Sequence, residues 1–143
     1  MSDTPDTDAM KNWNQQIIDE FRANAGVVGG PFEGQMMALL TTTGAKTGNA
    51  HTTPLVAGPA GDDVYVIASA AGSPKHPAWY TNLLANPTVT VEVTGDTFTA
   101  TARPADEPQR SELYAAMVER MPQFADYQKD NPRTIPVVVL ERA

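Results

Sequence analysis

The first stretch of this sequence that could do chemistry runs from Thr41 to Gly48. It places Lys46 and several hydroxyl side chains beside Gly44 and Gly48, whose backbone amides can approach an anion closely. Such a turn could hold a phosphate group. It is not a P-loop, because the glycine spacing is wrong and a strand rather than a helix is expected to follow. The alternative interpretation is an ordinary β-turn with a solvated lysine.

A second candidate site lies between Ala68 and Leu83. Small residues at the end of a predicted strand leave space for a planar ring, and Trp79 and Tyr80 can form an aromatic wall. In the same segment, Ser69 and Asn82 can supply oriented hydrogen bonds. The alternative interpretation is that the tryptophan only caps a hydrophobic core.

Other catalytic chemistries find little support in the sequence. Only two histidines are present, and His76 has no histidine or carboxylate at the spacing that a metal site requires. A hydrolase triad could be drawn with Ser69 and His76, but the sequence contains no G-x-S-x-G motif. Cysteine is absent, which excludes a thiolate nucleophile and disulfide bonds.

Composition and charge narrow the class of partner. A formal net charge of -7 argues against binding to nucleic acid, whose phosphates require a basic surface. No window approaches the roughly 20 apolar residues that a membrane span requires, and the first residues do not resemble a signal peptide. We therefore expect a cytoplasmic protein, without an integral membrane segment, that binds a small molecule.

The periodicity of apolar residues predicts three helices and about six strands. Trp13, Ile17, Ile18 and Phe21 recur at helical spacing, whereas the later segments are short, rich in Thr and Val, and separated by glycine turns. The predicted helices are 11–24, 78–85 and 106–119, and the predicted strands are 36–43, 52–57, 63–69, 88–93, 97–103 and 135–140. We expect residues 1–10 to be a disordered acidic tail and residues 11–143 to form a single domain.

The order of these elements predicts the fold class. Hairpin connections dominate, which indicates an α+β protein with mainly antiparallel strands. Closure of six such strands into a small barrel would leave no exposed sheet edge. We therefore predict a barrel rather than an open sheet.

Several ordered motifs resemble the deazaflavin (F420)-dependent nitroreductase family. These motifs are Leu39–Gly48 with Pro54-Leu55, Ala68-Ser69-x-x-Gly72, Pro77–Pro87 and Arg133–Val137, and together they cover about residues 36–140. The resemblance implies a split β-barrel related to the FMN-binding pyridoxamine oxidase fold. It also implies that coenzyme F420 binds in an open groove.

The resemblance further implies the roles of individual residues. Lys46 and Thr47 would hold the anionic phosphate and glutamyl tail of the coenzyme. The complete coenzyme site implied in this way is Lys46, Thr47, Gly48, His51, Pro54, Leu55, Val56, Ile67, Ala68, Ser69, Ala70, Ala78, Trp79, Tyr80 and Asn82. Ser69 and Tyr127 are the predicted catalytic hydroxyl groups, which would hydrogen-bond to the reduced substrate and protonate it.

The sequence departs from the nitroimidazole-reducing members that it resembles. Those members carry arginine at the position of His51, lysine at Ala70, and tyrosines at Met121 and Phe124, so that only Tyr127 of the tyrosine group remains. These differences make the substrate side more apolar and shift the expected substrate away from nitroimidazoles.

The predicted function is hydride transfer from reduced F420 to a flat, hydrophobic, activated substrate. The candidate substrates are an α,β-unsaturated carbonyl compound, a quinone or a nitro compound. Two alternatives are an FMN-dependent oxidoreductase of the pyridoxamine oxidase type and a non-enzymatic F420-binding carrier.

Overall fold

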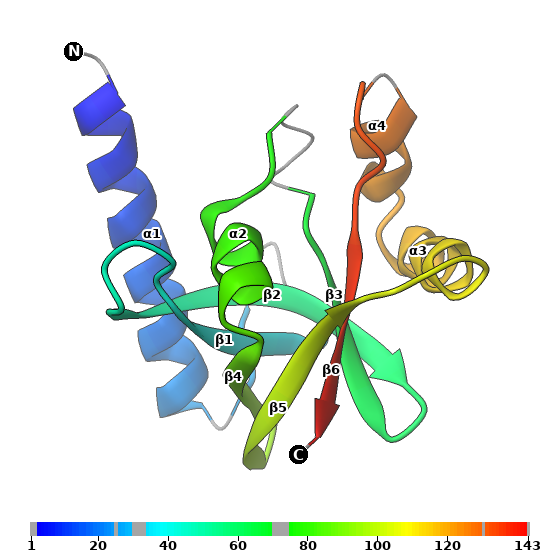
Figure 1. The fold of residues 1–143 in the computed structure, drawn as a ribbon. Helices are drawn as coiled ribbons and strands as arrows, with labels where there is room; N and C mark the ends of the chain where they lie inside the picture. Colours follow the sequence, from blue (N-terminus) through cyan, green and yellow to red (C-terminus); the bar gives the residue numbers. More distant parts are fainter. Residues whose placement is uncertain (1–2, 25, 30–33, 70–74, 130, 143) are drawn as a thin grey trace.

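A computed structural model describes residues 3–24, 26–29, 34–69, 75–129 and 131–142 of this chain. Within these residues, six strands close into an antiparallel barrel and four helices lie around it (Figure 1). The elements in chain order are α1 (Asp3–Ala23), β1 (Met37–Thr43), β2 (Ala50–Ala60), β3 (Asp63–Ile67), α2 (Ala78–Ala85), β4 (Thr88–Val93), β5 (Asp96–Pro104), α3 (Gln109–Arg120), α4 (Gln123–Lys129) and β6 (Val137–Arg142).

The strands follow the order β1-β2-β3-β6-β5-β4 around the barrel. Pairing of β4 with β1, which sets Leu40 opposite Val91, closes the circle. Every neighbouring pair of strands is antiparallel. The predicted α+β barrel of six strands is therefore confirmed, with one helix more than the three that we expected.

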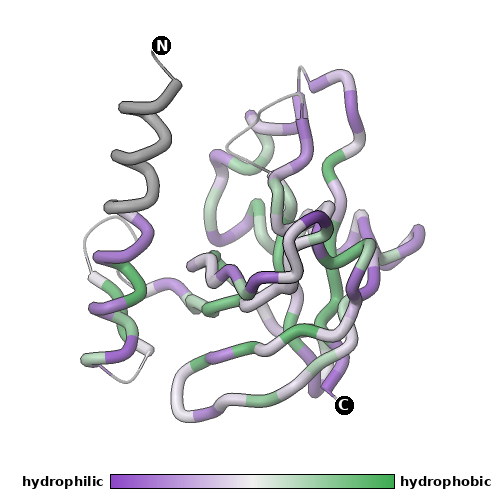
Figure 2. The backbone as a smooth tube through the Cα atoms, turned by 60° about the vertical axis from the view of Figure 1, so that its left-hand side comes forward, coloured by the Kyte–Doolittle hydropathy of each residue, from purple (hydrophilic) through white to green (hydrophobic). Residues whose placement is uncertain are grey.

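Both faces of β1 are covered, which explains its continuous apolar run. Ala38 and Leu40 point into the barrel, whereas Met37 and Leu39 point outward against α1. The helix offers a matching apolar face, which includes the buried side chain of Phe21. Figure 2 shows this alternation of hydrophobic and hydrophilic residues along the described part of α1.

On the other side of the barrel, α3 and α4 cover the outward-facing residues of β3 and β6. Val64 and Val66 pack inside the barrel, whereas Tyr65 and Ile67 belong to a second cluster beneath the two helices. Both faces of β3 are therefore covered. Helix α2 lies between α1 and the α3–α4 pair in Figure 1 and packs against β1 and β5.

Helix α1 begins at Asp3 rather than at residue 11. Residues 3–10, which we expected to belong to a disordered tail, are included in this helix. Pro5 is compatible with a first turn, because the N–H that it lacks would have no acceptor within the helix.

Strand β2 is longer than we predicted, because it continues through Gly58 and Pro59. A side chain on Gly58 would meet the ring of Tyr65, with a Cβ only 2.4 Å from its Cε1. The glycine is thus required by a close approach across the sheet rather than by a turn. The turn itself is confined to Gly61 and Asp62.

Candidate functional site

The turn between β1 and β2 is ordered by its own hydrogen bonds. The N–H of Gly48 donates to the carbonyl of Gly44 at 3.0 Å, and the N–H of Gly44 donates to the carbonyl of Asn49 at 2.8 Å. The hydroxyl Oγ1 of Thr47 accepts from the N–H of Asn49 at 3.2 Å. Gly44 leaves room for this hydroxyl, because a Cβ there would lie 2.7 Å from Oγ1. These hydrogen bonds therefore set the shape of the turn.

Asn82 of α2 connects this turn to the rest of the molecule. Its Oδ1 accepts from the N–H of Ala45 at 3.0 Å, and its Nδ2 donates to Oγ1 of Thr42 at 3.5 Å. One helical turn later, Nδ2 of Asn86 donates to the carbonyl of Thr43 at 3.4 Å. Two asparagines thus fix α2 against the end of β1 and the start of the turn.

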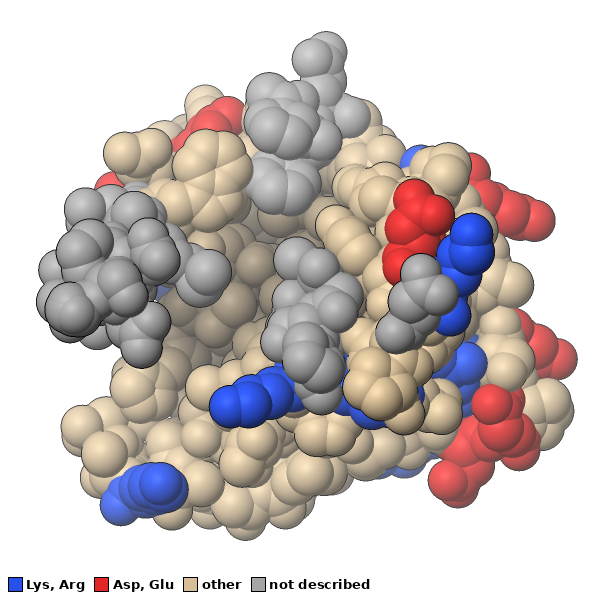
Figure 3. All heavy atoms as spheres, turned by 90° about the horizontal axis from the view of Figure 1, so that it is seen from above, with Lys and Arg blue, Asp and Glu red and all other residues tan. Residues whose placement is uncertain are grey.

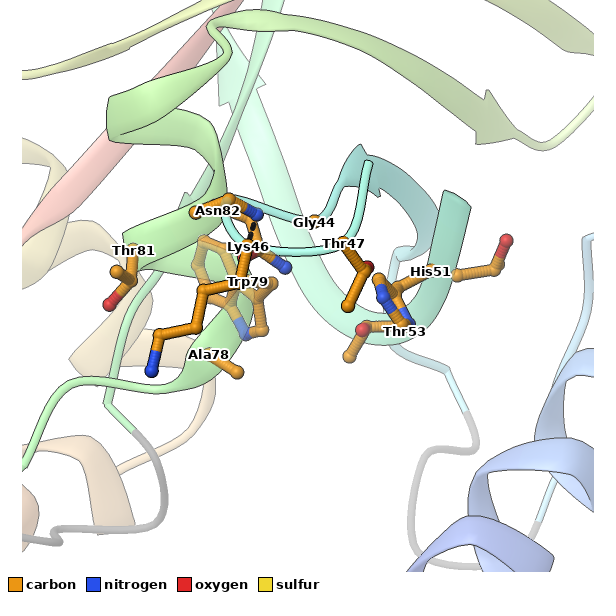
Figure 4. A pocket seen from close by; sticks show the side chains of 11 residues that line it. Gly44, Lys46, Thr47, His51, Thr53, Ala78, Trp79, Thr81 and Asn82 are labelled. Carbon is orange, nitrogen blue, oxygen red and sulfur yellow. Dashed lines mark hydrogen bonds between the residues drawn. The ribbon is translucent and has the colours of Figure 1, made fainter. Parts of the chain in front are cut away.

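A pocket of about 520 Å³ lies between the turn, the first residues of β2 and α2 (Figure 4). Lys46 and Thr47 come from the turn and His51 from β2, while Ala78 and Trp79 come from α2. The complete lining is Gly44, Ala45, Lys46, Thr47, His51, Thr52, Thr53, Ala78, Trp79, Thr81 and Asn82.

The electrostatics of this pocket favour an anion at the turn. Lys46 is exposed, and none of the carboxylates in the described part of the chain forms an ion pair with it. The backbone N–H groups of Lys46 and Thr47 likewise have no acceptor among the described residues. Figure 3 shows one face of the molecule hollowed, with most of the acidic side chains at its margin.

A second region lies at the end of β3, where Ala68 and Ser69 follow the last paired residue, Ile67. Ser69 is 8% exposed. Its carbonyl accepts from Nη2 of Arg133 at 2.9 Å, and the carbonyl of Ala68 accepts from Nη1 at 3.0 Å. Nη1 also lies 3.1 Å from Nδ1 of His76.

Burial shifts two pKa values in this region. It raises the pKa of the Tyr80 phenol, an effect that the positive charge of Arg133 partly opposes. Burial also lowers the pKa of Arg133, against the opposing influence of Tyr114 and Tyr80. The ring of Tyr80 packs against His76, with ring centroids 4.8 Å apart.

Tyr127, the other predicted catalytic residue, lies on α4. It is half-buried, and its ring packs edge-on against Phe124 at a centroid distance of 5.1 Å. Phe124 and Met121 are buried in the cluster beneath α3 and α4. These two residues, which replace tyrosines in the nitroimidazole-reducing members, therefore contribute to a packed core in this chain.

The structure brings together part of the predicted coenzyme site. Six of the predicted residues line the pocket: Lys46, Thr47, His51, Ala78, Trp79 and Asn82. Gly48 lies in the same turn with a φ of 73°, in the left-handed region that favours glycine. Ala70 lies outside the described residues.

The other predicted residues do not line this pocket. Leu55 packs against the barrel core and Val56 against the two outer clusters, while Pro54 pairs with Leu39 in the sheet. Ile67 and Ala68 belong to opposite clusters, and Tyr80 is buried in the barrel core. Ser69 and Tyr127 are likewise absent from the pocket lining. Their predicted roles in binding or catalysis remain predictions.

Sequence reasoning missed several residues of the pocket and one that organises its surroundings. Thr52 and Thr53 line the pocket, whereas the sequence indicated only that Thr53, directly before Pro54, is extended. Gly44, Ala45 and Thr81 also line it, and they lie within the two candidate stretches Thr41–Gly48 and Ala68–Leu83. Arg133 stood within a recognised motif, but its contacts with Ala68 and Ser69 span more than sixty residues and left no local signal.

Neither a metal centre nor a membrane-spanning helix is found among the described residues. In residues 3–142, leaving aside the positions that the structure does not describe, no three histidine, aspartate or glutamate side chains gather as metal ligands would. No helix among the described residues has both the length and the apolar character needed to cross a bilayer.

The closed barrel and the groove beside its cationic turn define a split-barrel protein. The fold is shared with a pyridoxamine 5'-phosphate oxidase-like protein from Listeria innocua at a TM-score of 0.56 and 15% identity, covering 74% of this chain and 82% of the other. A solved structure of an F420-H2 dependent reductase is 39% identical, with a TM-score of 0.68, and the match covers 73% of this chain and 93% of that one.

Sequence comparison identifies the family. An F420H(2)-dependent quinone reductase of Mycobacterium tuberculosis, Rv1261c, is 38% identical over 126 residues, which is 85% of this chain and 85% of the relative. The family model of the F420H(2)-dependent quinone reductases matches residues 13–142. The chain belongs to this family. It is therefore an oxidoreductase that depends on reduced F420, as the resemblance in its motifs implied.

Proposed function

We propose that this chain binds reduced F420 in the pocket between the 44–49 turn and α2 and reduces a quinone. One groove combines the cation of Lys46 and two backbone N–H groups, none of which has a partner among the described residues, with an aromatic wall, and this combination is the observation that carries the location. Family membership supports the coenzyme, and the name of the relatives supports the substrate class.

The residues of the pocket fit the two chemically different parts of the coenzyme. Lys46 and the N–H groups of Lys46 and Thr47 suit the anionic phosphate and glutamyl tail, because charged hydrogen bonds and backbone nests both favour anions. Trp79, which is only 7% exposed, offers a rigid apolar surface for the flat ring system. Asn82 supports this arrangement by holding the turn.

When bound, reduced F420 supplies a hydride. The protein must hold donor and acceptor in contact and limit the access of water. Conversion of a quinone to a hydroquinone takes up the hydride and one proton. We propose that the hydroxyl of Ser69 or Tyr127, or a water molecule, supplies that proton. The buried position of Ser69 and the partly buried position of Tyr127 are compatible with such a role.

The apolar character around Tyr127 supports a hydrophobic substrate. Met121 and Phe124 are both 8% exposed and present no hydroxyl groups. Without tyrosine hydroxyls at these two positions, a nitroimidazole has fewer hydrogen-bond partners near Tyr127, so we propose a planar quinone as the substrate. Reduction of α,β-unsaturated carbonyl compounds is the second substrate class that we propose. The cytoplasmic location expected from the sequence remains a prediction.

The test combines equilibrium titration with turnover. The protein is titrated with F420 and with FMN while coenzyme fluorescence is followed, and oxidation of reduced F420 is then measured anaerobically with a naphthoquinone, a cyclohexenone and a nitroimidazole. We expect binding of F420 in preference to FMN and oxidation with the naphthoquinone. Preference for FMN would contradict the coenzyme assignment, and F420 binding without oxidation by any compound would indicate a carrier.

A further inference from the structure

Arg133 reaches the two peptide groups that follow strand β3. The ladder between β3 and β6 ends with the pair Ile67 and Val137, so the carbonyls of Ala68 and Ser69 lie beyond regular strand pairing. Both accept hydrogen bonds from the guanidinium of Arg133, at 3.0 and 2.9 Å. An arginine presents its donors in a rigid plane, so this contact fixes the orientation of both peptides.

The same guanidinium fixes His76, which precedes α2. Arginine has no acceptor, so Nδ1 of His76 must accept the contact at 3.1 Å and the ring proton must lie on Nε2. The histidine ring in turn packs against Tyr80 of α2. Arg133 therefore joins the end of β3 to the segment that leads into the helix beside the pocket.

Arg133 is itself held by α4 through its backbone. Its carbonyl accepts from Nε2 of Gln128 at 2.9 Å, and its N–H donates to Oδ1 of Asn131 at 3.1 Å. Asn131 also donates through Nδ2 to the carbonyl of Tyr127 at 3.4 Å. A continuous path of hydrogen bonds thus runs from Tyr127 through Asn131 and Arg133 to Ser69.

A second set of contacts makes this path rigid. Oε1 of Gln128 accepts from Nη2 of Arg110 and from the N–H of Ile135, both at 2.8 Å. Arg110 also donates from Nε and Nη2 to the carbonyl of Ile135, at 3.0 and 2.9 Å. Helices α3 and α4 therefore hold the residues on either side of Arg133 before its side chain reaches β3.

We propose that Arg133 is a positioning residue for the reduction, which sets Ser69 relative to Tyr127 and the start of α2. This inference rests on the proposed function, because the two hydroxyl groups are the proposed proton donors. Arg133 acts through the backbone carbonyl of Ser69 and through His76.

The test uses Arg133→Ala and Arg133→Lys, with Arg103→Ala as the control. Arg103 forms an exposed ion pair with Glu141 on the barrel surface. Arg103→Ala therefore also removes an arginine side chain, but at a site away from the contacts of Arg133. We expect both Arg133 variants to lower kcat by about tenfold to about a hundredfold, as misplacement of a catalytic group does. The Kd for F420, measured by fluorescence, is expected to change by less than about threefold, because the 44–49 turn and Asn82 are untouched.

Two readouts separate positioning from general loss of structure. Guanidinium ion, added far below unfolding concentrations, is expected to restore part of the turnover of Arg133→Ala, whereas sodium chloride at equal ionic strength is not. In the protein without coenzyme, ¹⁵N NMR of His76 is expected to show the Nε2–H tautomer in the unsubstituted protein and a mixture of tautomers in Arg133→Ala.

The outcomes are distinguishable. Unchanged kcat in both variants overturns the role of Arg133 in turnover while leaving the proposed function intact. A parallel loss of turnover and F420 binding without guanidinium rescue also overturns this role and leaves the proposed function intact. An unchanged His76 tautomer in Arg133→Ala overturns the contact on which the proposal is built. If the unsubstituted protein oxidises no reduced F420 with any quinone or enone, the proposed function itself fails, whatever the NMR result.

Discussion

Oδ1 of Asn82 accepts a hydrogen bond from the backbone N–H of Ala45 at 3.0 Å and so joins α2 to the turn that carries Lys46. The family resemblance implied that Asn82 belongs to the coenzyme site. The structure shows that its side chain is engaged with the protein, because both polar atoms contact β1 or the turn. Asn82 therefore both lines the pocket and holds the turn that forms one of its walls.

Replacement of Asn82 should weaken coenzyme binding through the turn. Asn82→Ala removes both hydrogen bonds of this side chain, and the one that holds the turn at Ala45 is worth about 1 kcal/mol, so the Kd for F420 should rise roughly fivefold. Asn82→Asp keeps an acceptor for Ala45 but adds a negative charge near Lys46, and it should weaken binding of the anionic coenzyme further. Fluorescence titration measures both, with the exposed Leu84→Ala on the same helix as the control. Equal affinities in Asn82→Ala and the unsubstituted protein would contradict this role.

Neutralisation of Lys46 should weaken F420 binding by an electrostatic mechanism. Lys46→Gln removes an exposed charge, and such a contact is worth up to about 1 kcal/mol, or about a fivefold change in Kd. The difference between variant and unsubstituted protein should shrink as salt is added. Lys129→Gln, at the end of α4 and also exposed, serves as the control. A difference that does not depend on salt would argue against direct attraction.

Introduction of a methyl group at Gly58 should destabilise the barrel. The new Cβ would lie 2.4 Å from Cε1 of Tyr65 and 2.5 Å from Nη2 of Arg120, so the ring must move. Overpacking of this kind costs about 1 to about 3 kcal/mol in the free energy of unfolding. Urea unfolding measures the loss for Gly58→Ala. Gly29→Ala is the control, because a Cβ there would meet only Oε2 of Glu20, at 3.5 Å. Equal free energies of unfolding in both variants would show that the Tyr65 ring can move without a loss of stability.

Stability should fall in alkaline solution because of two buried tyrosines. Burial raises the pKa of Tyr80 and of Tyr114 above the usual 10.0, although Arg133 and Arg110 partly oppose the effect. The neutral phenols thus contribute stability that is complete below about pH 10 and is lost as the pH rises through the folded-state values. Between about pH 9 and about pH 11, the free energy of unfolding should decrease less steeply in Tyr80→Phe than in the unsubstituted protein. Identical slopes would contradict this assignment.

The sequence was most informative where local pattern and tertiary environment agree. Helix α2 has the bounds that we predicted, because Pro77 precedes it and Asn86-Pro87 ends it. Strand β3 was recognised by its uninterrupted apolar residues, which the structure buries on both faces. The turn with Lys46 was also predicted, since glycines and a lysine in a short connection form a local signal.

The features of the fold and the site that the sequence did not predict depend on contacts between distant segments. Along β2, alternation cannot tell which residues face a groove, and Leu55 and Val56 pack into hydrophobic clusters instead. Gly58 and Pro59 suggested a turn, yet the need to accommodate Tyr65 explains the glycine within a strand. The contacts of Arg133 could be found only after folding brought β3 and the loop before β6 together.

The position of β6 has a consequence for biosynthesis. This strand is synthesised after the other five, yet it lies between β3 and β5 in the barrel. A nascent chain that ends before residue 137 exposes two unpaired edges, which are sites where strands of other chains can add. The barrel closes only once residues 137–142 have left the ribosome, so premature termination there should yield an aggregation-prone product rather than a smaller working enzyme.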